Sequence, residues 1–397
     1  MKRRDFLKAS ALASSTLMVP SFLKAYNGQN NGSRGGKNLV VVQLSGGNDG
    51  LNTIIPFQND IYYQSRPSLS ISKGEVLKIN GEMGFNPALK ALQPLYDQGL
   101  MSIVNSVGYP NPDRSHFRSM DIWHTASNSD EHWSNGWIGR YLDSQCSGCQ
   151  LAHHALEVDD GLSLALKGEQ GRGFAMSNVN QLKKTTSNRF LQAIGQQHGL
   201  ADDHHNVGYL YKTLIDTHAS ADYLYQQSRL HKSKVAYPAN AFGRDLKQIA
   251  ELMTADSDIK IYYVSLTGFD THVNQKNQQA RLLQQYAEGM AAFVKDLQQN
   301  RLLDDTLIMT FSEFGRRVRQ NASGGTDHGT ANNLFLMGGR LQKPGFFNEA
   351  PDLSRLDQGD LIYQVDFRDI YASIIDRWLG ESSKEILKRK FKGMPIV

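Results

Sequence analysis

Continuous apolar runs divide the chain into predicted strands. Four of them occupy residues 39–44, 101–107, 259–266 and 306–311, and a shorter one lies at 334–337. Runs rich in β-branched residues are typical of strands that are buried on both faces, as in a parallel sheet. The pattern therefore predicts a central sheet built from strands far apart in the sequence.

Segments with helical spacing alternate with these strands. Residues 86–98 place Leu89, Leu92 and Leu95 on one face, and Gly99 follows as a stop signal. Further helices are predicted to begin near residue 113 and at Asp366, and to occupy residues 204–232, 241–254 and 276–300. Strands that alternate with helices predict an α/β fold, with a mostly parallel sheet and helices on both faces. The region at about 150–255 is interpreted as a helical insertion that covers the sheet.

The N-terminus has an export pattern instead of core residues. Arg3 and Arg4 precede a modest apolar stretch at 9–19, which is too short for a stable membrane span. We expect residues 1–25 to be a signal peptide recognised by the Tat translocase, and the Gly/Asn-rich residues 26–37 to be a flexible linker. The protein is then expected to be periplasmic or secreted.

Charge and composition limit the class of partner. Residues 1–25 carry five basic side chains and one acidic one, a net of +4 that equals the net charge of all 397 residues. The remaining chain is near neutral, so the pI of 8.8 does not indicate nucleic-acid binding. With 40% hydrophobic residues, the chain has ample core for one large domain over residues 38–397.

The two cysteines form a lone Cys-x-x-Cys pair. Cys146 and Cys149 have no second pair with which to build a four-cysteine zinc site. In an exported protein this spacing predicts a local disulfide.

Acids and histidines follow the predicted strands. Asp49 follows the first strand, Asp270 and His272 follow the strand at 259–266, and Glu313 follows the strand at 306–311. Asp327 and His328 lie in a glycine-marked loop before the last strand. In doubly wound sheets ligands bind beyond the carboxyl ends of the strands, so these groups are predicted to meet in a one- or two-metal hydrolytic site. Helix capping by Asp49 and turn ordering by Asp270 stay open as alternatives.

Five motifs resemble domain-of-unknown-function family 1501, over about residues 38–380. They are SGGNDGLN at 45–52, RSHF at 114–117, GFDTH at 268–272, SEFGR at 312–316 and GTDHG at 325–329. Members of this family are exported and similar in pattern to the alkaline phosphatase and sulfatase superfamily. The resemblance implies an alkaline-phosphatase-like three-layer sandwich.

The superfamily pattern also implies roles for individual residues. By resemblance the metal ligands are Asp49, Asp270, His272, Asp327 and His328, and the ions are one or two divalent metals: zinc, with manganese or calcium as alternatives. Two departures stand out, since Asp270 and His272 replace the usual Asp-x-x-x-His and no histidine follows His328. A full pair of metal sites therefore needs Glu313, Asp366 or His116 as a substitute.

Ser115 has two interpretations. Serine before a helix is commonly an N-cap, whereas the resemblance implies a nucleophile, and a helix N-terminus favours an anionic ester. His116 beside it is a candidate ligand or proton donor. Arg316 is a candidate for binding the substrate anion, with a surface salt bridge as the alternative.

These features together predict an exported metal-dependent hydrolase of a small anionic, phosphate-type ester or of an envelope or glycan substrate. A sulfatase is disfavoured, because the segment that starts at Ser115 lacks the Cys/Ser-x-Pro-x-Arg pattern from which formylglycine is made. The alternative is a non-catalytic exported binding protein that keeps a degenerate site. A metal-free serine esterase finds no support, since no Gly-x-Ser-x-Gly motif occurs.

Overall fold

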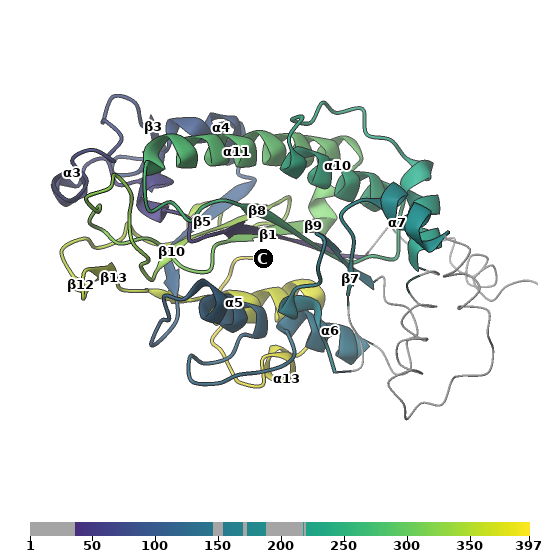
Figure 1. The fold of residues 1–397 in the computed structure, drawn as a ribbon. Coiled ribbons are helices and arrows are strands. Elements are labelled where there is room, and N and C mark those ends of the chain that lie inside the picture. Colours follow the sequence, from purple (N-terminus) through teal and green to yellow (C-terminus); the bar gives the residue numbers. More distant parts are fainter. Residues whose placement is uncertain (1–35, 146–153, 170–172, 188–216, 218–219) are drawn as a thin grey trace, which may run out of the picture. The chain divides into compact units, whose positions relative to one another are not determined.

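The computed structural model describes residues 36–145, 154–169, 173–187, 217 and 220–397 (Figure 1). The predicted signal peptide, most of the predicted linker and the pair Cys146 and Cys149 lie outside these residues. Their assignments therefore stay predictions.

A nine-stranded sheet forms the centre, in the order β11-β5-β10-β9-β1-β8-β6-β7, with β14 also paired to β5. The strands are β1 (Asn38–Ser45), β5 (Met101–Gly108), β6 (Ala155–Val158), β7 (Phe174–Ala175), β8 (Ile261–Thr267), β9 (Thr306–Phe311), β10 (Asn332–Gly338), β11 (Gly345–Phe346) and β14 (Val365–Asp366). Strand β1 is parallel to both neighbours, β8 and β9, while β10 is antiparallel to β5 and β9. The prediction of a mostly parallel sheet is confirmed, and each of the five apolar runs forms a strand of it.

Both faces of the sheet are buried, which explains the continuous apolar runs. Along β1, Val40 and Val42 belong to one hydrophobic cluster, whereas Leu39 and Val41 belong to another. Successive side chains of a strand point to opposite faces, so a strand covered on both sides needs an apolar residue at every position.

Helices cover the two faces as separate layers (Figure 1). One layer contains η2 (Pro87–Leu92), α4 (Gln93–Asp97), α10 (Ala241–Thr254) and α11 (Gln275–Gln299). The other contains α5 (His116–Thr125), α6 (Trp137–Gln145), α12 (Phe367–Ser373), the π-helix η6 (Ile374–Leu379) and α13 (Ser383–Ile386). The predicted three-layer α/β architecture is thus observed.

Smaller elements complete the domain. They are η1 (Gly50–Asn52), α3 (Asp60–Ser65), η4 (Leu164–Leu166), α7 (Val179–Thr186), η5 (Leu303–Asp305), a three-stranded sheet of β2 (Ile54–Ile55), β4 (Gly84–Phe85) and β3 (Leu77–Lys78), and the pair β12 (Leu356–Asp357) and β13 (Asp360–Leu361). Within the described residues, no helix is both long and apolar enough to cross a bilayer.

The region at 150–255 is more than the helical insertion that the sequence predicts. It contains α7 and α10, but also β6 and β7, which extend the central sheet beyond β8. These strands have only four and two residues, and β6 includes the buried Glu157. So short a run, interrupted by an acid, carries no recognisable strand pattern.

The strand directions gather four loops at one edge of the sheet. Strands β1, β8 and β9 are mutually parallel, and β5 has the same direction because β10 is antiparallel to both β5 and β9. Their carboxyl ends therefore share an edge. The segments that follow them, beginning at residues 46, 109, 268 and 312, carry the predicted site residues.

Candidate metal centre

Three imidazoles surround one carboxylate oxygen at this edge. The Nε2 atoms of His272, His328 and His116 lie 3.1, 3.2 and 3.4 Å from Oδ1 of Asp270. The rings also contact one another, with centroids of His116 and His328 4.4 Å apart and those of His272 and His328 4.7 Å apart. Ligand atoms of His116, Asp270 and His328 all lie within 4.8 Å of one another.

Each imidazole has an oxygen atom on its far side. Nδ1 of His116 lies 2.8 Å from Oε1 of Glu313, and Nδ1 of His328 lies 2.7 Å from the carbonyl oxygen of Arg114. Nδ1 of His272 lies 3.5 Å from Oδ1 of Asp327. For His116 and His328, the oxygen acceptor at Nδ1 orients the ring and directs Nε2 to the opposite side, which is how metal-binding histidines are held in proteins.

The local sequence explains how these residues meet. His116 opens helix α5 after β5, Asp270 and His272 follow β8, and His328 lies in the loop between β9 and β10. That loop folds back on itself through an isolated bridge between Arg316 and His328. Gly329 allows this contact, since a Cβ atom there would lie 2.6 Å from the carbonyl carbon of Arg316.

Electrostatics favour the ligand forms of two of these groups. Partial burial alone would raise the pKa of Asp270, but the hydrogen bond and the positive charge of the Arg316 guanidinium outweigh it and lower the pKa to about 2. Burial, with the positive charge of Arg316, lowers the pKa of His328. The carboxylate is therefore ionised at neutral pH. His328 is neutral, and because a carbonyl oxygen only accepts a hydrogen bond, its proton is on Nδ1 and its lone pair on Nε2.

One buried nitrogen has no hydrogen-bond partner. Nε2 of His116 is inaccessible to solvent and makes no hydrogen bond within the described part of the chain, although it faces Asp270. The hydrogen bond to Glu313 raises the pKa of His116. Three nitrogens and one carboxylate oxygen are a donor set that suits zinc. His116, His328 and Asp270 therefore fit a divalent ion, and His272 lies beside them with its Nε2 2.9 Å from Nε2 of His328.

Glu313 and Asp327 do not lie at the centre of the group, where the sequence predicts metal ligands. Each of them contacts a histidine from the outside. The Glu313 carboxylate is fully buried and accepts from the backbone N–H of Gly46 as well as contacting His116. Asp327 is 60% exposed and lies beside His272. Both acids contact histidines and not the centre, because the imidazoles stand between them and Asp270.

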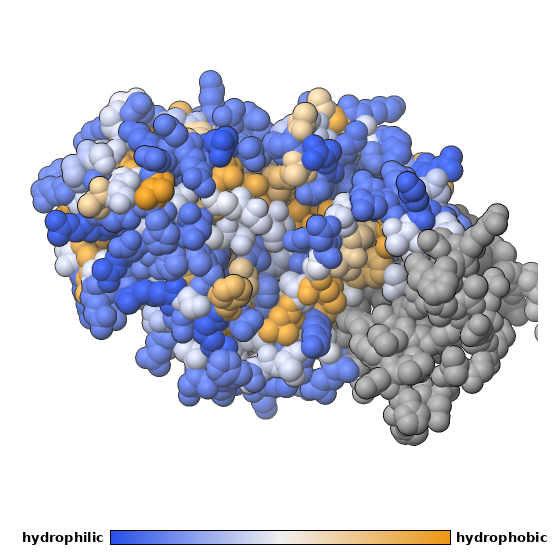
Figure 2. Space-filling model, in the orientation of Figure 1, coloured by the Kyte–Doolittle hydropathy of each residue, from blue (hydrophilic) through white to orange (hydrophobic). Residues whose placement is uncertain are grey.

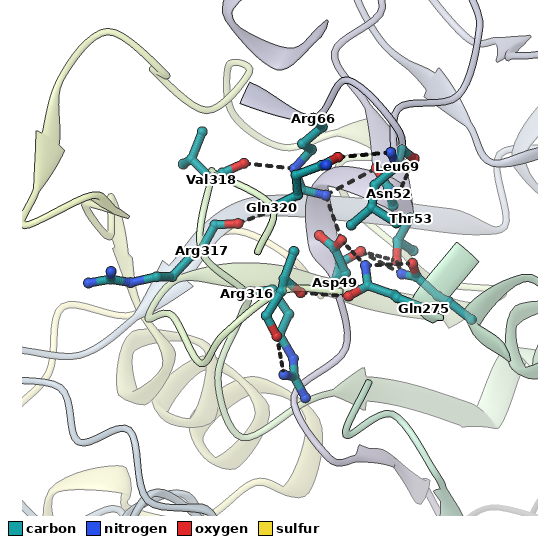
Figure 3. Close-up of polar contacts among 12 residues, drawn as sticks. Asp49, Asn52, Thr53, Arg66, Leu69, Gln275, Arg316, Arg317, Val318 and Gln320 are labelled. Carbon is teal, nitrogen blue, oxygen red and sulfur yellow. Dashed lines mark hydrogen bonds and ion pairs between the residues drawn. The ribbon is translucent and has the colours of Figure 1, made fainter. Parts of the chain in front are cut away.

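Asp49 departs from the predicted ligand set. Its carboxylate is 1% exposed, and Oδ2 accepts from Nη1 of Arg66 and from Nε2 of Gln275, each at 2.5 Å (Figure 3). The guanidinium supplies the positive charge that a metal ion would supply. Asp49 is therefore engaged in an ion pair and is not part of the group around Asp270. Arg66 comes directly after α3, and no pattern in the sequence indicates that it folds back onto Asp49.

Arg316 also differs from its expected role. Its side chain has no exposed surface, and its N–H groups donate to the backbone oxygens of Gly46, Gly47 and Thr326 and to Oδ1 of Asp270. The residue holds three loops together and orients Asp270, so it is not placed to bind a substrate anion directly.

Ser115 occupies the N-cap position of α5, next to His116. Its side chain is exposed and makes no capping hydrogen bond. Its backbone N–H instead donates to Oδ1 of Asp113 at 2.7 Å. The hydroxyl is thus not used for capping, and the nucleophile role stays a prediction.

A cavity of about 500 Å³ opens beside the histidine group. It is lined by His116, Asp270, Glu313, Ser45, Gly46, Phe117, Met120, Asp121, His124, Thr267 and Gly268. Figure 2 shows hydrophobic side chains reaching the surface between the layer of α10 and α11 and the layer of α5 and α6. The sequence analysis missed His124. Its signal is the spacing of His116, Met120 and His124 at i, i+4 and i+8, which places all three on one face of α5.

Residues 99–388 match the family described as "Protein of unknown function (DUF1501)". No curated protein matches the sequence.

Three similar solved structures have low sequence identity to this chain. A protein of the alkaline phosphatase superfamily from Vibrio parahaemolyticus is 9% identical with a TM-score of 0.41, and covers 89% of this chain and 69% of its own. The C-terminal periplasmic domain of EcEptC from Escherichia coli, in complex with Zn, is 11% identical with a TM-score of 0.38, and the coverage is 77% and 74%. The PsFucS1 sulfatase from Pseudoalteromonas sp. is 12% identical with a TM-score of 0.38, and the coverage is 94% and 72%.

Proposed function

The chain belongs to the DUF1501 family, and from the site that it carries we propose that it is a metal-dependent hydrolase of an anionic, phosphate-type ester. One observation supports this most directly. Three imidazoles, each with an oxygen atom at Nδ1, direct their Nε2 atoms toward the carboxylate of Asp270. Such outer contacts are typical of metal ligands and not of surface histidines.

The donor set favours one zinc ion. Imidazole nitrogens suit zinc and disfavour calcium, which takes oxygen ligands, so manganese is the remaining alternative. Because Asp49 is neutralised by Arg66, it does not supply a second ion with a ligand. We therefore propose a site for a single ion, held by His116, His272, His328 and Asp270.

The charge balance around the site explains why a cation is needed. Asp270 and Glu313 line the cavity and Asp327 lies beside His272, so an anionic ester would meet negative charge there. A divalent ion, when bound, would offset that charge, polarise the ester and lower the pKa of an attacking hydroxyl or water. The acids then keep the histidines in the orientation that binds the ion.

Helix α5 contributes the remaining groups. Its first N–H groups, which follow Ser115 at the N-cap position, have no partner within the helix and favour a bound anion. We propose that the Ser115 hydroxyl attacks the phosphorus, so that a bond from its Oγ forms while the bond to the leaving alcohol oxygen breaks. The alcohol takes up the proton, and water then releases the phosphate from the serine. Arg316 keeps Asp270 in place during these steps.

The activity test compares substrates and variants on the purified, zinc-loaded protein. Aryl phosphates, phosphodiesters and aryl sulfates are assayed side by side. The mass of the peptide containing residue 115 is measured by mass spectrometry. We expect phosphate ester turnover, an unmodified serine, and the loss of most of the rate in Ser115→Ala. Exposed His132 provides the control, since His132→Ala should keep the rate. Sulfate turnover or a formylglycine mass would contradict the proposal. Bound metal without turnover on any ester would favour a binding protein instead.

A further inference from the structure

The cavity beside the histidine group has a lining that the hydrolytic chemistry does not require. One face of α5 forms its wall, because Phe117, Asp121 and His124 are spaced by four and three residues. The cavity, at about 500 Å³, is larger than a phosphate group needs. Space remains for the alcohol portion of an ester whose phosphate lies at His116 and Asp270.

The polar groups on this wall are hydrogen-bond acceptors. Met120 Sδ only accepts, so the Gln43 side chain turns its NH2 group toward it and its Oε1 toward Tyr263. The Tyr263 hydroxyl then donates to Gln43 and accepts from Nε2 of His124, 3.1 Å away. His124 therefore carries its proton on Nε2, and burial lowers its pKa to about 4, so the ring is neutral. Its remaining nitrogen, Nδ1, is an acceptor.

Asp121 adds a second acceptor, a carboxylate that is not used by the part of the chain that the structure describes. Its backbone oxygen accepts from the Thr125 hydroxyl, but its carboxylate makes no hydrogen bond or ion pair within the described residues. A molecule that fills the cavity must therefore bring donors. Hydroxyl groups meet this requirement without adding charge.

Phe117 supplies an apolar surface at the same place. Its side chain is 87% exposed, the most exposed large hydrophobic residue among those described, although it lies in the first turn of α5 beside His116. An aromatic ring that is left in water at the edge of a cavity gains free energy when another flat apolar face covers it. The faces of a sugar ring are apolar while its edge carries hydroxyls, so one molecule meets both the aromatic and the acceptor requirement.

We propose that this cavity is a subsite for a hydroxylated ring, so that the protein acts on the phosphate ester of a sugar. Phe117 stacks on the ring, and the Asp121 carboxylate and His124 accept hydrogen bonds from its hydroxyls. The identity of the ester rests on the proposed function, but the affinity for the ring does not, because the subsite lies outside the set of metal ligands.

The test uses ester-free methyl glycopyranosides, whose binding needs neither metal nor turnover. Saturation-transfer NMR is recorded on the full chain with a panel of neutral hexosides, and the dissociation constant of the strongest binder is measured for Phe117→Ala and Asp121→Asn. We expect binding by at least one hexoside, weakened about fivefold to tenfold in each variant. The exposed Leu230 gives the control, and Leu230→Ala should leave binding unchanged. Phe117 is exposed, so its replacement does not threaten folding.

The outcomes separate this inference from the proposed function. Hexoside binding that persists in His328→Ala would support the subsite even if that variant lost its metal and no ester were cleaved. Turnover of aryl phosphates without binding of any hexoside would overturn the subsite and leave the hydrolase intact. Preferential binding of choline or ethanolamine would also overturn the sugar subsite. The acceptors and the aromatic ring would then bind a cation and not a neutral hydroxylated ring.

Discussion

At the scale of the residue, the site depends on groups that do not touch its centre. Glu313, Asp327 and the carbonyl oxygen of Arg114 each contact one histidine at Nδ1. The sequence predicts Glu313 and Asp327 as ligands because it places acids at the right edge of the sheet. It does not reveal which acid lies behind which imidazole, since that depends on contacts between loops far apart in the chain.

Glu313 offers the sharpest test of this outer contact. Glu313→Gln keeps the shape but removes the charge that stabilises the proton on Nδ1 of His116. We expect zinc affinity to fall by about 10- to 100-fold with the fold retained. The measurement is a competition titration with a fluorescent chelator, and the exposed Glu82→Gln is the control. Equal affinities for the Glu313 variant and the wild type would refute the outer role.

The buried pair of Arg66 and Asp49 is expected to stabilise the fold. Both side chains are at most 1% exposed, so Arg66→Met leaves an unpaired charge on Asp49 in the interior. The expected cost is about 3–5 kcal/mol in the free energy of unfolding, measured by urea denaturation. The double variant Arg66→Met, Asp49→Asn should recover part of that loss. A single variant as stable as the wild type would show that Asp49 has another cationic partner, such as a bound ion.

At the scale of the element, long strands were predictable and short ones were not. The apolar runs of β1, β5, β8, β9 and β10 fill both faces of the sheet and are therefore visible in the sequence. The four residues of β6 are held by pairing with β8, a tertiary contact that outweighs the presence of Glu157. The predicted helix at 86–98 begins as the 3-10 helix η2 and continues as the short α4.

Glu157 in β6 should make stability depend on pH. Burial raises its pKa to about 7, against an ordinary value of 4.5. As the pH rises, the unfolded chain therefore loses the Glu157 proton at a lower pH than the folded chain does. The stabilisation that the protonated Glu157 gives the folded state is complete below pH 4.5 and is lost as the pH rises to about 7. Glu157→Gln should remove this decline and gain up to about 3 kcal/mol at pH 8 relative to the wild type. Urea denaturation at pH 5 and pH 8 checks this, and a variant with the wild-type pH dependence would contradict it.

At the scale of the whole molecule, topology assembles the site. Parallel strands β1, β8 and β9 end at one edge, so acids that follow them were predictable as neighbours. Which of them meet was not. Arg66 arrives from a short helix outside the sheet and pairs with Asp49, while His116 arrives from α5 and joins Asp270. Asp49 thus lies outside the group around Asp270, whereas His116, which the sequence names as a substitute ligand, lies within it.

The central claim is a single metal ion held by three histidines and Asp270. Elemental analysis of protein purified after native export tests it most directly, with the wild type compared with His116→Ala and with His132→Ala as control. The account predicts one zinc per chain in the wild type and the control, and a loss of most of the metal in His116→Ala. Protein that stays metal-free after reconstitution with zinc and manganese, or that keeps its full metal content in His116→Ala, would contradict it.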